Sequence, residues 1–397
     1  MQGPLSGVRV VDFSAVVSGP LAAMWLADQG ADVVKVELPG AGDITRGIRA
    51  APDREGLSGL YVNCNRGKRA ITVDVATDAG REIILDLSRT ADVFIQNWRP
   101  GVVDRLGLGY EHVAAVNPEI IYVSISGFGP DGPYSQRRVY DPIIQGLTGH
   151  VAVQVNPEIP FPDLVRTIVC DKATALSTAQ AVSAALFARE RGAGGQHLVI
   201  PMLDVGMSFF FPDGYMAKAW LDDEFADDRT TLARSYRVQT TADGHLIYFC
   251  ASDSEFHGLY RALGHPEWVT DQRFDSPLNR QQNRLELGAL IAESFETWKN
   301  ADIVPRLEAE QVPFAPALDL DELQENVQIV NNQALRTRDH PSLGRLLEAR
   351  HPVRFSKTPV DVTPIAPSIG AHTNEVLAEL GRSPAEIESL RIAGVIA

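Results

Sequence analysis

The chain has 397 residues, of which 45% are hydrophobic and 22% charged, so it can bury the cores of two globular domains. Its formal net charge of -15 at pH 7 repels polyanions, and no cluster of basic residues offsets it, so we expect no binding to nucleic acid. The sequence has neither an apolar run long enough to cross a membrane nor a signal-peptide pattern at residues 1–6, so we expect a cytoplasmic protein with no membrane partner.

Strand-like apolar runs alternate with helical patterns over the first third of the chain. The strand-like runs cover residues 8–13, 32–37, 70–75, 92–96 and 120–126, and the helical patterns include residues 20–29 and 78–89. This alternation predicts an α/β fold with a Rossmann-like parallel sheet. Ligands bind beyond the carboxyl ends of such strands, where residues 14–19, 38–46 and 97–105 fall.

Asp171 stands between an apolar run and a helical pattern over residues 172–191, which leads to a strand predicted at 197–203. An aspartate at a helix start commonly caps the helix by accepting a backbone N–H. The same position, at the positive end of the helix dipole, also keeps a carboxylate ionised, and an ionised carboxylate is a nucleophile. Position alone leaves both interpretations open.

Beyond Asp204 the alternation stops. A helical stretch over 205–221 and acidic residues 222–228 predict a linker, and residues 236–239 and 246–250 predict a hairpin. Helical patterns follow at 255–263, 280–296 and 301–311, and residues 341–367 are expected to cross the surface of the first domain. We therefore predict residues 1–205 as the first part of a large domain, 206–228 as a linker helix and acidic segment, 229–326 as a small α+β domain, and 327–397 as the return to the large domain, which both chain ends build.

Several common enzyme motifs are missing or misplaced. Residues 127–132 match G-x-G-x-x-G, but Pro130 and Pro133 make this run a turn that opens no helix, which argues against a bound NAD. No G-x-S-x-G motif is present, and neither the nine histidines nor the three cysteines have metal-ligand spacing, so we expect no metal and no tightly bound cofactor. Cys170 is interpreted as a small buried residue, and His150 as a weak candidate for proton transfer.

Five segments carry a resemblance to a known family: residues 7–14, 43–47, 131–146, 167–174 and 370–377. They resemble the class III CoA-transferases, the CaiB/BaiF family, which includes formyl-CoA and carnitine CoA-transferases and 2-methylacyl-CoA racemase. The resemblance covers nearly the whole chain. It implies a transferase that moves CoA from an acyl-CoA thioester to a carboxylic acid acceptor through an aspartyl-CoA intermediate on Asp171. It also implies coenzyme A as a substrate and an interlocked homodimer.

The resemblance assigns further roles around Asp171. Tyr140 matches a tyrosine beside the reacting thioester, and Arg138 matches a basic residue at the CoA phosphates. The other CoA-binding positions match Asn97, Arg99, Arg105, Val73 and Ala76, the last two along the adenine ring. From the residues alone, the two arginines of this set can equally be a solvated pair, and Val73 and Ala76 part of a strand core.

The chain departs from the family pattern near the acyl group and the adenine. Val17 occupies a position where some relatives have a glutamine that helps to hold the acyl group, and Leu38 and Pro39 replace basic residues near the adenine. The run of glycines that closes over the site in formyl-CoA transferase has no counterpart between Asp222 and Leu246. These departures predict a more apolar acyl pocket and argue against formyl-CoA or oxalate as substrates.

Two other functions stay open. The racemase of this family pairs a histidine with its carboxylate, and that histidine aligns with Tyr140. Because the pKa of tyrosine, about 10, is unsuited to proton exchange at neutral pH, transferase activity is favoured. The remaining alternative is a catalytically silent CoA-binding protein.

Overall fold

A computed structural model describes residues 3–48, 56–154, 162–222, 232–341, 343–360 and 363–397. The chain divides into two units, Met1–Pro212 together with Gln333–Ala397, and Asp213–Asn332. The first unit is thus assembled from both ends of the chain. Residues 223–228 of the predicted acidic segment lie outside the described residues. No helix in the described ranges is both long and apolar enough to cross a membrane.

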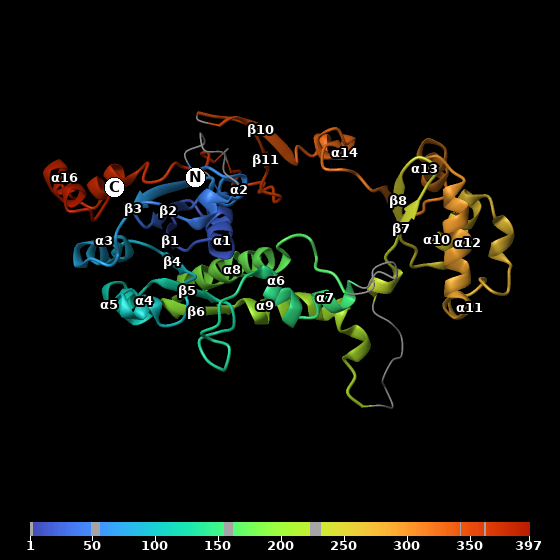
Figure 1. Ribbon diagram of the computed structural model, residues 1–397, viewed down its shortest axis with the longest axis horizontal. Coiled ribbons are helices and arrows are strands. Elements are labelled where there is room, and N and C mark those ends of the chain that lie inside the picture. The colour runs from blue at the N-terminus through green and yellow to red at the C-terminus, as the bar shows by residue number, and fades with distance from the viewer. Residues whose placement is uncertain (1–2, 49–55, 155–161, 223–231, 342, 361–362) are drawn as a thin grey trace. The chain divides into compact units, whose positions relative to one another are not determined.

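The first unit is built on a parallel sheet with the strand order β3-β2-β1-β4-β5-β6 (Figure 1). Its strands are β1 (Arg9–Phe13), β2 (Asp32–Glu37), β3 (Lys68–Thr72), β4 (Val93–Gln96), β5 (Ile121–Ser126) and β6 (Gln196–Pro201). Every pairing in this sheet is parallel, which confirms the predicted sheet. The order reverses between β1 and β4, the position where sheets of this kind bind ligands.

Helices cover both faces of this sheet, because successive side chains of a strand point to opposite faces. Val10 and Val93 face a core shared with α1 and α8, whereas Val11 and Phe94 face a core shared with α3, α5 and the C-terminal helices (Figure 1). The helices of this unit are α1 (Ser18–Ala27), α2 (Gly59–Asn65), α3 (Asp78–Arg89), α4 (Val102–Arg105), α5 (Tyr110–Val116), α6 (Asp141–Leu147), α7 (His150–Val153), α8 (Val169–Ala188), α9 (Met202–Gly214), α15 (Thr373–Glu379) and α16 (Pro384–Ile392).

The long helix α8 packs along α1. Small residues let the two helices approach closely, and Ala22 of α1 shares an apolar cluster with Ala175 of α8 and with Val17. Helix α8 begins at Val169, one turn earlier than the predicted start at residue 172, and a π-helical turn, Arg189–Ala193, follows its end. The first turns of the two helices therefore lie beside each other.

The third strand lies at Lys68–Thr72 and not at the predicted residues 70–75. Its pairing with β2 runs from Val33 opposite Lys68 to Glu37 opposite Thr72. A charged residue does not fit an apolar strand pattern, but the ammonium of Lys68 is buried at 2.8 Å from the carboxylate of Asp12. A long-range ion pair therefore decides where this strand begins.

A hairpin near the C-terminus was not predicted. Its strands β10 (Leu335–His340) and β11 (Gly344–Ala349) are antiparallel and carry many charged residues, which hide the alternation that marks a strand. Arg336 and Arg338 lie 3.3 and 3.4 Å from Glu348 across the pair. Charge pairing across the two strands replaces the apolar face.

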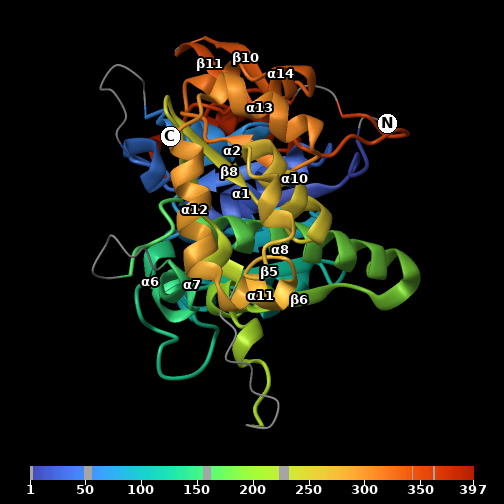
Figure 2. The ribbon, with the colours of Figure 1, turned by 90° about the vertical axis from the view of Figure 1, so that its right-hand side faces the viewer.

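The second unit joins a small antiparallel sheet to helices, of which α10 and α12 are seen in Figure 2. Its elements are β7 (Val238–Thr240), β8 (His245–Tyr248), α10 (Asp253–Leu263), α11 (Pro277–Gln282), α12 (Arg284–Glu296), α13 (Asn300–Ala309), β9 (Phe314–Pro316) and α14 (Val327–Asn331). Tyr260, Ile291 and Ile303 contribute to its core. The predicted hairpin is confirmed as β7 and β8, and β9 adds an unpredicted third strand to β8.

Candidate active site

Two loops meet where the strand order reverses: residues 14–17 follow β1, and residues 97–101 follow β4. Asn97 joins them, because its Oδ1 accepts the Ala15 N–H at 2.9 Å and its Nδ2 donates to the Ala15 carbonyl oxygen at 2.6 Å. The amide group of Asn97 thus makes two hydrogen bonds to the protein itself. In this structure, Asn97 fixes the loop after β1 to the loop after β4.

Asp171 lies in the first turn of α8 but does not cap that helix. The N-cap residue is Ile168, and no side-chain capping bond is made. Instead, the Asp171 carboxylate lies beside Ser18, the first residue of α1, whose backbone N–H and hydroxyl favour the ionised form of this carboxylate. Only 8% of Asp171 is exposed. The carboxylate therefore faces the positive end of a second helix, an arrangement that the sequence pattern did not reveal.

Burial has the largest effect on the acidity of Asp171. Burial and the negative charge of Asp141 raise the pKa of Asp171 to about 6, while the hydrogen bonds from Ser18 lower it. The expectation that a helix start alone sets the charge of this carboxylate is therefore incomplete. At neutral pH the group is still mostly ionised, and it is more basic than an ordinary aspartate, as a nucleophile requires.

Asp141 holds the start of α8 in place. Its Oδ2 accepts the N–H of Cys170 at 2.7 Å and the N–H of Asp171 at 3.0 Å, which satisfies two backbone donors of the first turn. Asp141 is itself buried at the start of α6, with its other oxygen bound to Gln145. The sequence analysis missed both Asp141 and Ser18. The sequence pattern that could have identified them is a polar residue one or two positions before a proline at a helix start.

Tyr140 is the N-cap residue of α6 and precedes Asp141 directly. Its side chain lies largely in solvent, with 61% of the residue exposed. Tyr140 and Asp171 therefore stand at the starts of two helices that Asp141 joins.

The other predicted CoA-binding residues differ in accessibility. Arg99, Arg105 and Arg138 are exposed, the first two on the loop and short helix after β4. Val73 lies in the core beyond the end of β3, whereas Ala76 is exposed. Val17 is buried as the N-cap residue of α1, one position before Ser18.

Cys170 and His150, two further residues singled out in the sequence, are both buried. Burial and the charge of Asp141 raise the pKa of the Cys170 thiol to about 12, so this thiol is protonated and not nucleophilic. His150 is buried, with its Nδ1 at 2.8 Å from the Thr148 hydroxyl and its ring beside Phe210. Among the residues that the structure describes, no three His, Cys, Asp or Glu side chains are grouped to hold a metal ion.

Comparison with known proteins identifies the family of the chain. The sequence profile of CoA-transferase family III matches residues 5–373. Succinate–glutarate CoA-transferase of Agrobacterium fabrum is 34% identical over 385 residues, which span 95% of this chain and 96% of that protein. Formyl-CoA:oxalate CoA-transferase of Streptomyces avermitilis is 32% identical over 416 residues and is covered over 100% of both chains. The crystal structure of a CaiB/BaiF family protein from Brucella suis matches with a TM-score of 0.81 and 32% identity, over 96% of this chain and 100% of that one.

The fold, the site and these matches define an enzyme that transfers CoA and takes CoA thioesters as substrates. The chain belongs to CoA-transferase family III, as the resemblance predicted.

Proposed function

We propose that Asp171 is the nucleophile of this CoA-transferase and carries CoA as an aspartyl-CoA thioester between donor and acceptor. One observation carries the proposal: a buried carboxylate in the first turn of α8, whose pKa is raised to about 6, lies beside the first residue of α1. Such a group is ionised at neutral pH, and exclusion of water protects the activated acyl group from hydrolysis.

The proposed reaction keeps an activated acyl group, as a thioester or an anhydride, at each step. An Asp171 oxygen attacks the acyl-CoA carbonyl, and the C–S bond breaks to give an aspartyl acyl anhydride and a CoA thiolate. The thiolate attacks the aspartyl carbonyl, which forms aspartyl-CoA and releases the donor carboxylate. The acceptor carboxylate then repeats both steps in reverse order. Ser18 is placed to donate to the developing oxyanions, an effect worth about 3 kcal/mol per donor.

We assign CoA binding to the exposed side of the loops that follow β1 and β4. Arg99, Arg105 and Arg138 are exposed guanidinium groups suited to phosphate oxygens. Asn97 orders the loop at residues 14–17 in this assignment, and Ala76 offers the accessible surface for the adenine, with Val73 supporting it from the core. Tyr140 extends into solvent beside the start of α6 and is the proposed contact to the reacting acyl group.

The substrates that we propose are dicarboxylates longer than oxalate, such as succinate or glutarate, and the CoA thioesters of these acids. Val17, the residue before Ser18, is buried in an apolar cluster with Ala175 of α8, and we take this cluster as the wall of the acyl pocket. The Agrobacterium relative, which is 34% identical, is named for succinate and glutarate. An apolar wall favours the methylene groups of these acids over a formyl group.

We also propose a homodimer, interlocked as the family resemblance implies, in the cytoplasm. Leu176 and Phe187 of α8 and Phe209 of α9 are large apolar side chains exposed on the single chain. Exposed apolar side chains of this size commonly mark a protein–protein interface. Light scattering of the purified protein tests the dimer, and a monomer at micromolar concentration would contradict it. The cytoplasmic location remains a prediction from composition.

The decisive experiment traps the intermediate. The protein is incubated with succinyl-CoA, glutaryl-CoA or formyl-CoA and then with hydroxylamine, and peptides are analysed by mass spectrometry. We expect a hydroxamate on Asp171. We expect Asp171→Asn to fold like the wild type, form no adduct and lose transfer by at least about 10³-fold. Substantial turnover by this variant would refute the assignment.

The same acyl-CoAs distinguish the alternatives that the sequence left open. Exchange of the α-hydrogen with deuterated solvent, without an adduct, would identify a racemase. CoA binding without adduct or exchange would identify a silent binding protein. The relatives reported above are named as CoA-transferases, which supports transfer over both of these alternatives.

A further inference from the structure

The loop between β1 and α1 contains a strained residue. Among the described residues, Val16, Gln311 and Gln333 are the non-glycine residues with positive φ, and Val16, at +73°, is the β-branched one. This conformation is unfavourable for a β-branched side chain and persists only where surrounding contacts enforce it. Val16 lies two residues before Ser18, whose backbone N–H and hydroxyl lower the pKa of Asp171, and one before Val17, which packs in a cluster with Ala175 of α8.

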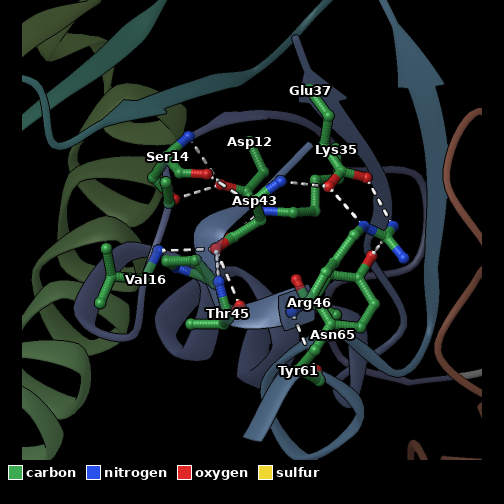
Figure 3. Close-up of polar contacts among 12 residues, drawn as sticks. Asp12, Ser14, Val16, Lys35, Glu37, Asp43, Thr45, Arg46, Tyr61 and Asn65 are labelled. Atoms are coloured by element: carbon green, nitrogen blue, oxygen red, sulfur yellow. Dashed lines mark hydrogen bonds and ion pairs between the residues drawn. The ribbon is translucent and has the colours of Figure 1, made fainter. Parts of the chain in front are cut away.

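Side chains from β2 and from the loops after β2 and β4 hold the backbone of the residues around Val16 (Figure 3). The Lys35 ammonium donates to the Ser14 carbonyl oxygen at 3.0 Å, and the Asp43 Oδ1 accepts the Val16 N–H at 3.2 Å. Asn97 holds both backbone groups of Ala15. Three consecutive loop residues are therefore fixed by side chains that contact the backbone.

Asp43 and Lys35 form a buried ion pair at 3.0 Å. Burial tends to raise the pKa of Asp43, but Lys35 and Thr45 outweigh it and hold this pKa below its usual value. Burial likewise tends to lower the pKa of Lys35, but Asp12 and Asp43 outweigh it and hold that pKa above its usual value. Both groups are therefore charged at neutral pH. A buried pair is costly relative to an apolar core, so a local stabilising role does not account for it.

The two carboxylate oxygens of Asp43 bind different partners. Its Oδ2 binds Lys35, while its Oδ1 accepts from Val16 and from the N–H and hydroxyl of Thr45 at 2.9 and 2.8 Å. Next to this pair, Lys68 bridges Asp12 and the Pro20 carbonyl oxygen, both at 2.8 Å, in the first turn of α1. The network thus contacts the chain before and after Val17 and Ser18.

We propose that the Lys35–Asp43 pair is a positioning device for the reaction: it holds Val16 in its strained conformation and so aims the Ser18 donors at Asp171. This inference rests on the proposed role of Asp171 as the nucleophile. Lys35 and Asp43 are positioning residues, because they act on the reaction through their hydrogen bonds to the backbone of Ser14 and Val16. Contacts with the buried pair keep the loop in a strained conformation that the loop would not adopt without them.

The test uses Asp43→Asn, because asparagine has one acceptor oxygen and cannot serve both Lys35 and Val16. We expect acylation of Asp171 in a single turnover to slow by about 30-fold, with KM for the acyl-CoA within about threefold, since small misplacements of reacting groups cost rate. Glycine adopts positive φ without strain. Val16→Gly should therefore leave the rate within about threefold and restore the Asp43→Asn variant by about tenfold.

The matched control is Asp28→Asn, which breaks a second buried pair, Asp28 with Arg66 at 2.5 Å, at the opposite end of α1. We expect this variant to lose thermal stability comparably but to acylate Asp171 at the wild-type rate. If Asp28→Asn slows acylation as much as Asp43→Asn does, the effect is loss of stability and the proposal is wrong. Failure of Val16→Gly to restore a folded Asp43→Asn variant also refutes it.

Hydrogen exchange separates this inference from the proposed nucleophile. In Asp43→Asn, the peptide that covers residues 14–18 should exchange its amides at least about tenfold faster, and in Asp28→Asn at the wild-type rate. If the wild type forms no Asp171 adduct with any acyl-CoA, the proposed function fails, while this readout still shows whether the pair holds the loop. Unchanged exchange in a folded Asp43→Asn protein would overturn the positioning role.

Discussion

At the scale of single residues, the environment of Asp171 predicts the pH dependence of the reaction. Only the ionised carboxylate attacks a thioester, and the pKa of Asp171 is raised to about 6, chiefly by burial. We therefore expect the single-turnover rate of Asp171 acylation to rise with pH through a midpoint near about 6 and to level off above about 7. Quenched-flow mass spectrometry measures this rate. A midpoint near about 4, as for an exposed aspartate, would contradict the buried setting.

The same shift predicts how Asp171 affects stability. The folded protein binds this proton more tightly than the unfolded chain, because the pKa rises from its usual value of 3.8 to about 6. The contribution to stability is thus fully present below the unfolded pKa and is lost as pH rises through the folded pKa. Asp171→Asn mimics the neutral acid, so we expect it to be more stable than the wild type by about 1 to 3 kcal/mol at pH 7 and nearly equal at about pH 4. Denaturant unfolding at the two pH values measures the difference.

At the scale of elements, Asp141 connects the starts of α6 and α8. It supplies both hydrogen-bond acceptors and a negative charge, and two variants separate these contributions. Asp141→Asn removes the charge but keeps an acceptor oxygen, so we expect the midpoint of the pH–rate profile to fall below that of the wild type. Asp141→Ala also leaves two buried N–H groups unsatisfied, at a cost of about 1 to 3 kcal/mol each.

The two Asp141 variants are compared by the midpoint of the pH–rate profile and by the free energy of unfolding. A lower midpoint in Asp141→Asn with little loss of stability would show that the charge acts on Asp171. An unshifted midpoint in that variant would mean that Asp141 serves only as a cap for α8.

At the scale of the whole chain, the C-terminus completes the core of the first unit. Ile396 is buried in the cluster beneath β3, and Ala397 donates its N–H to the Thr72 hydroxyl at 3.0 Å. We expect Ile396→Ala to lower the free energy of unfolding by about 2 to 5 kcal/mol, through lost contacts and a cavity. Ile392, which is 80% exposed on α16, offers a matched control, and Ile392→Ala should change stability by less than about 0.5 kcal/mol. Equal effects of the two changes in thermal or denaturant unfolding would contradict this role of the C-terminus.

The sequence by itself determined the features that depend on local pattern. Alternating apolar runs predicted the parallel sheet, with β2 and α3 at the observed bounds, because burial of one side of each element leaves a period in the sequence. Motifs such as the run around Asp171 indicated the family for the same reason: they are contiguous segments. The apolar pattern did not predict the start of β3 or the β10–β11 hairpin, because charged residues form these elements.

Only the tertiary structure decided how the residues of the site act on one another. Ser18 lies beside Asp171, and Asp43 meets Val16, across long stretches of chain, and Asn97 binds the backbone of Ala15. Such contacts leave no period in the sequence, because each depends on where the sheet brings separate loops together. The acidity of Asp171 has the same origin, since burial is a property of the packed molecule and not of the residues beside it in the chain.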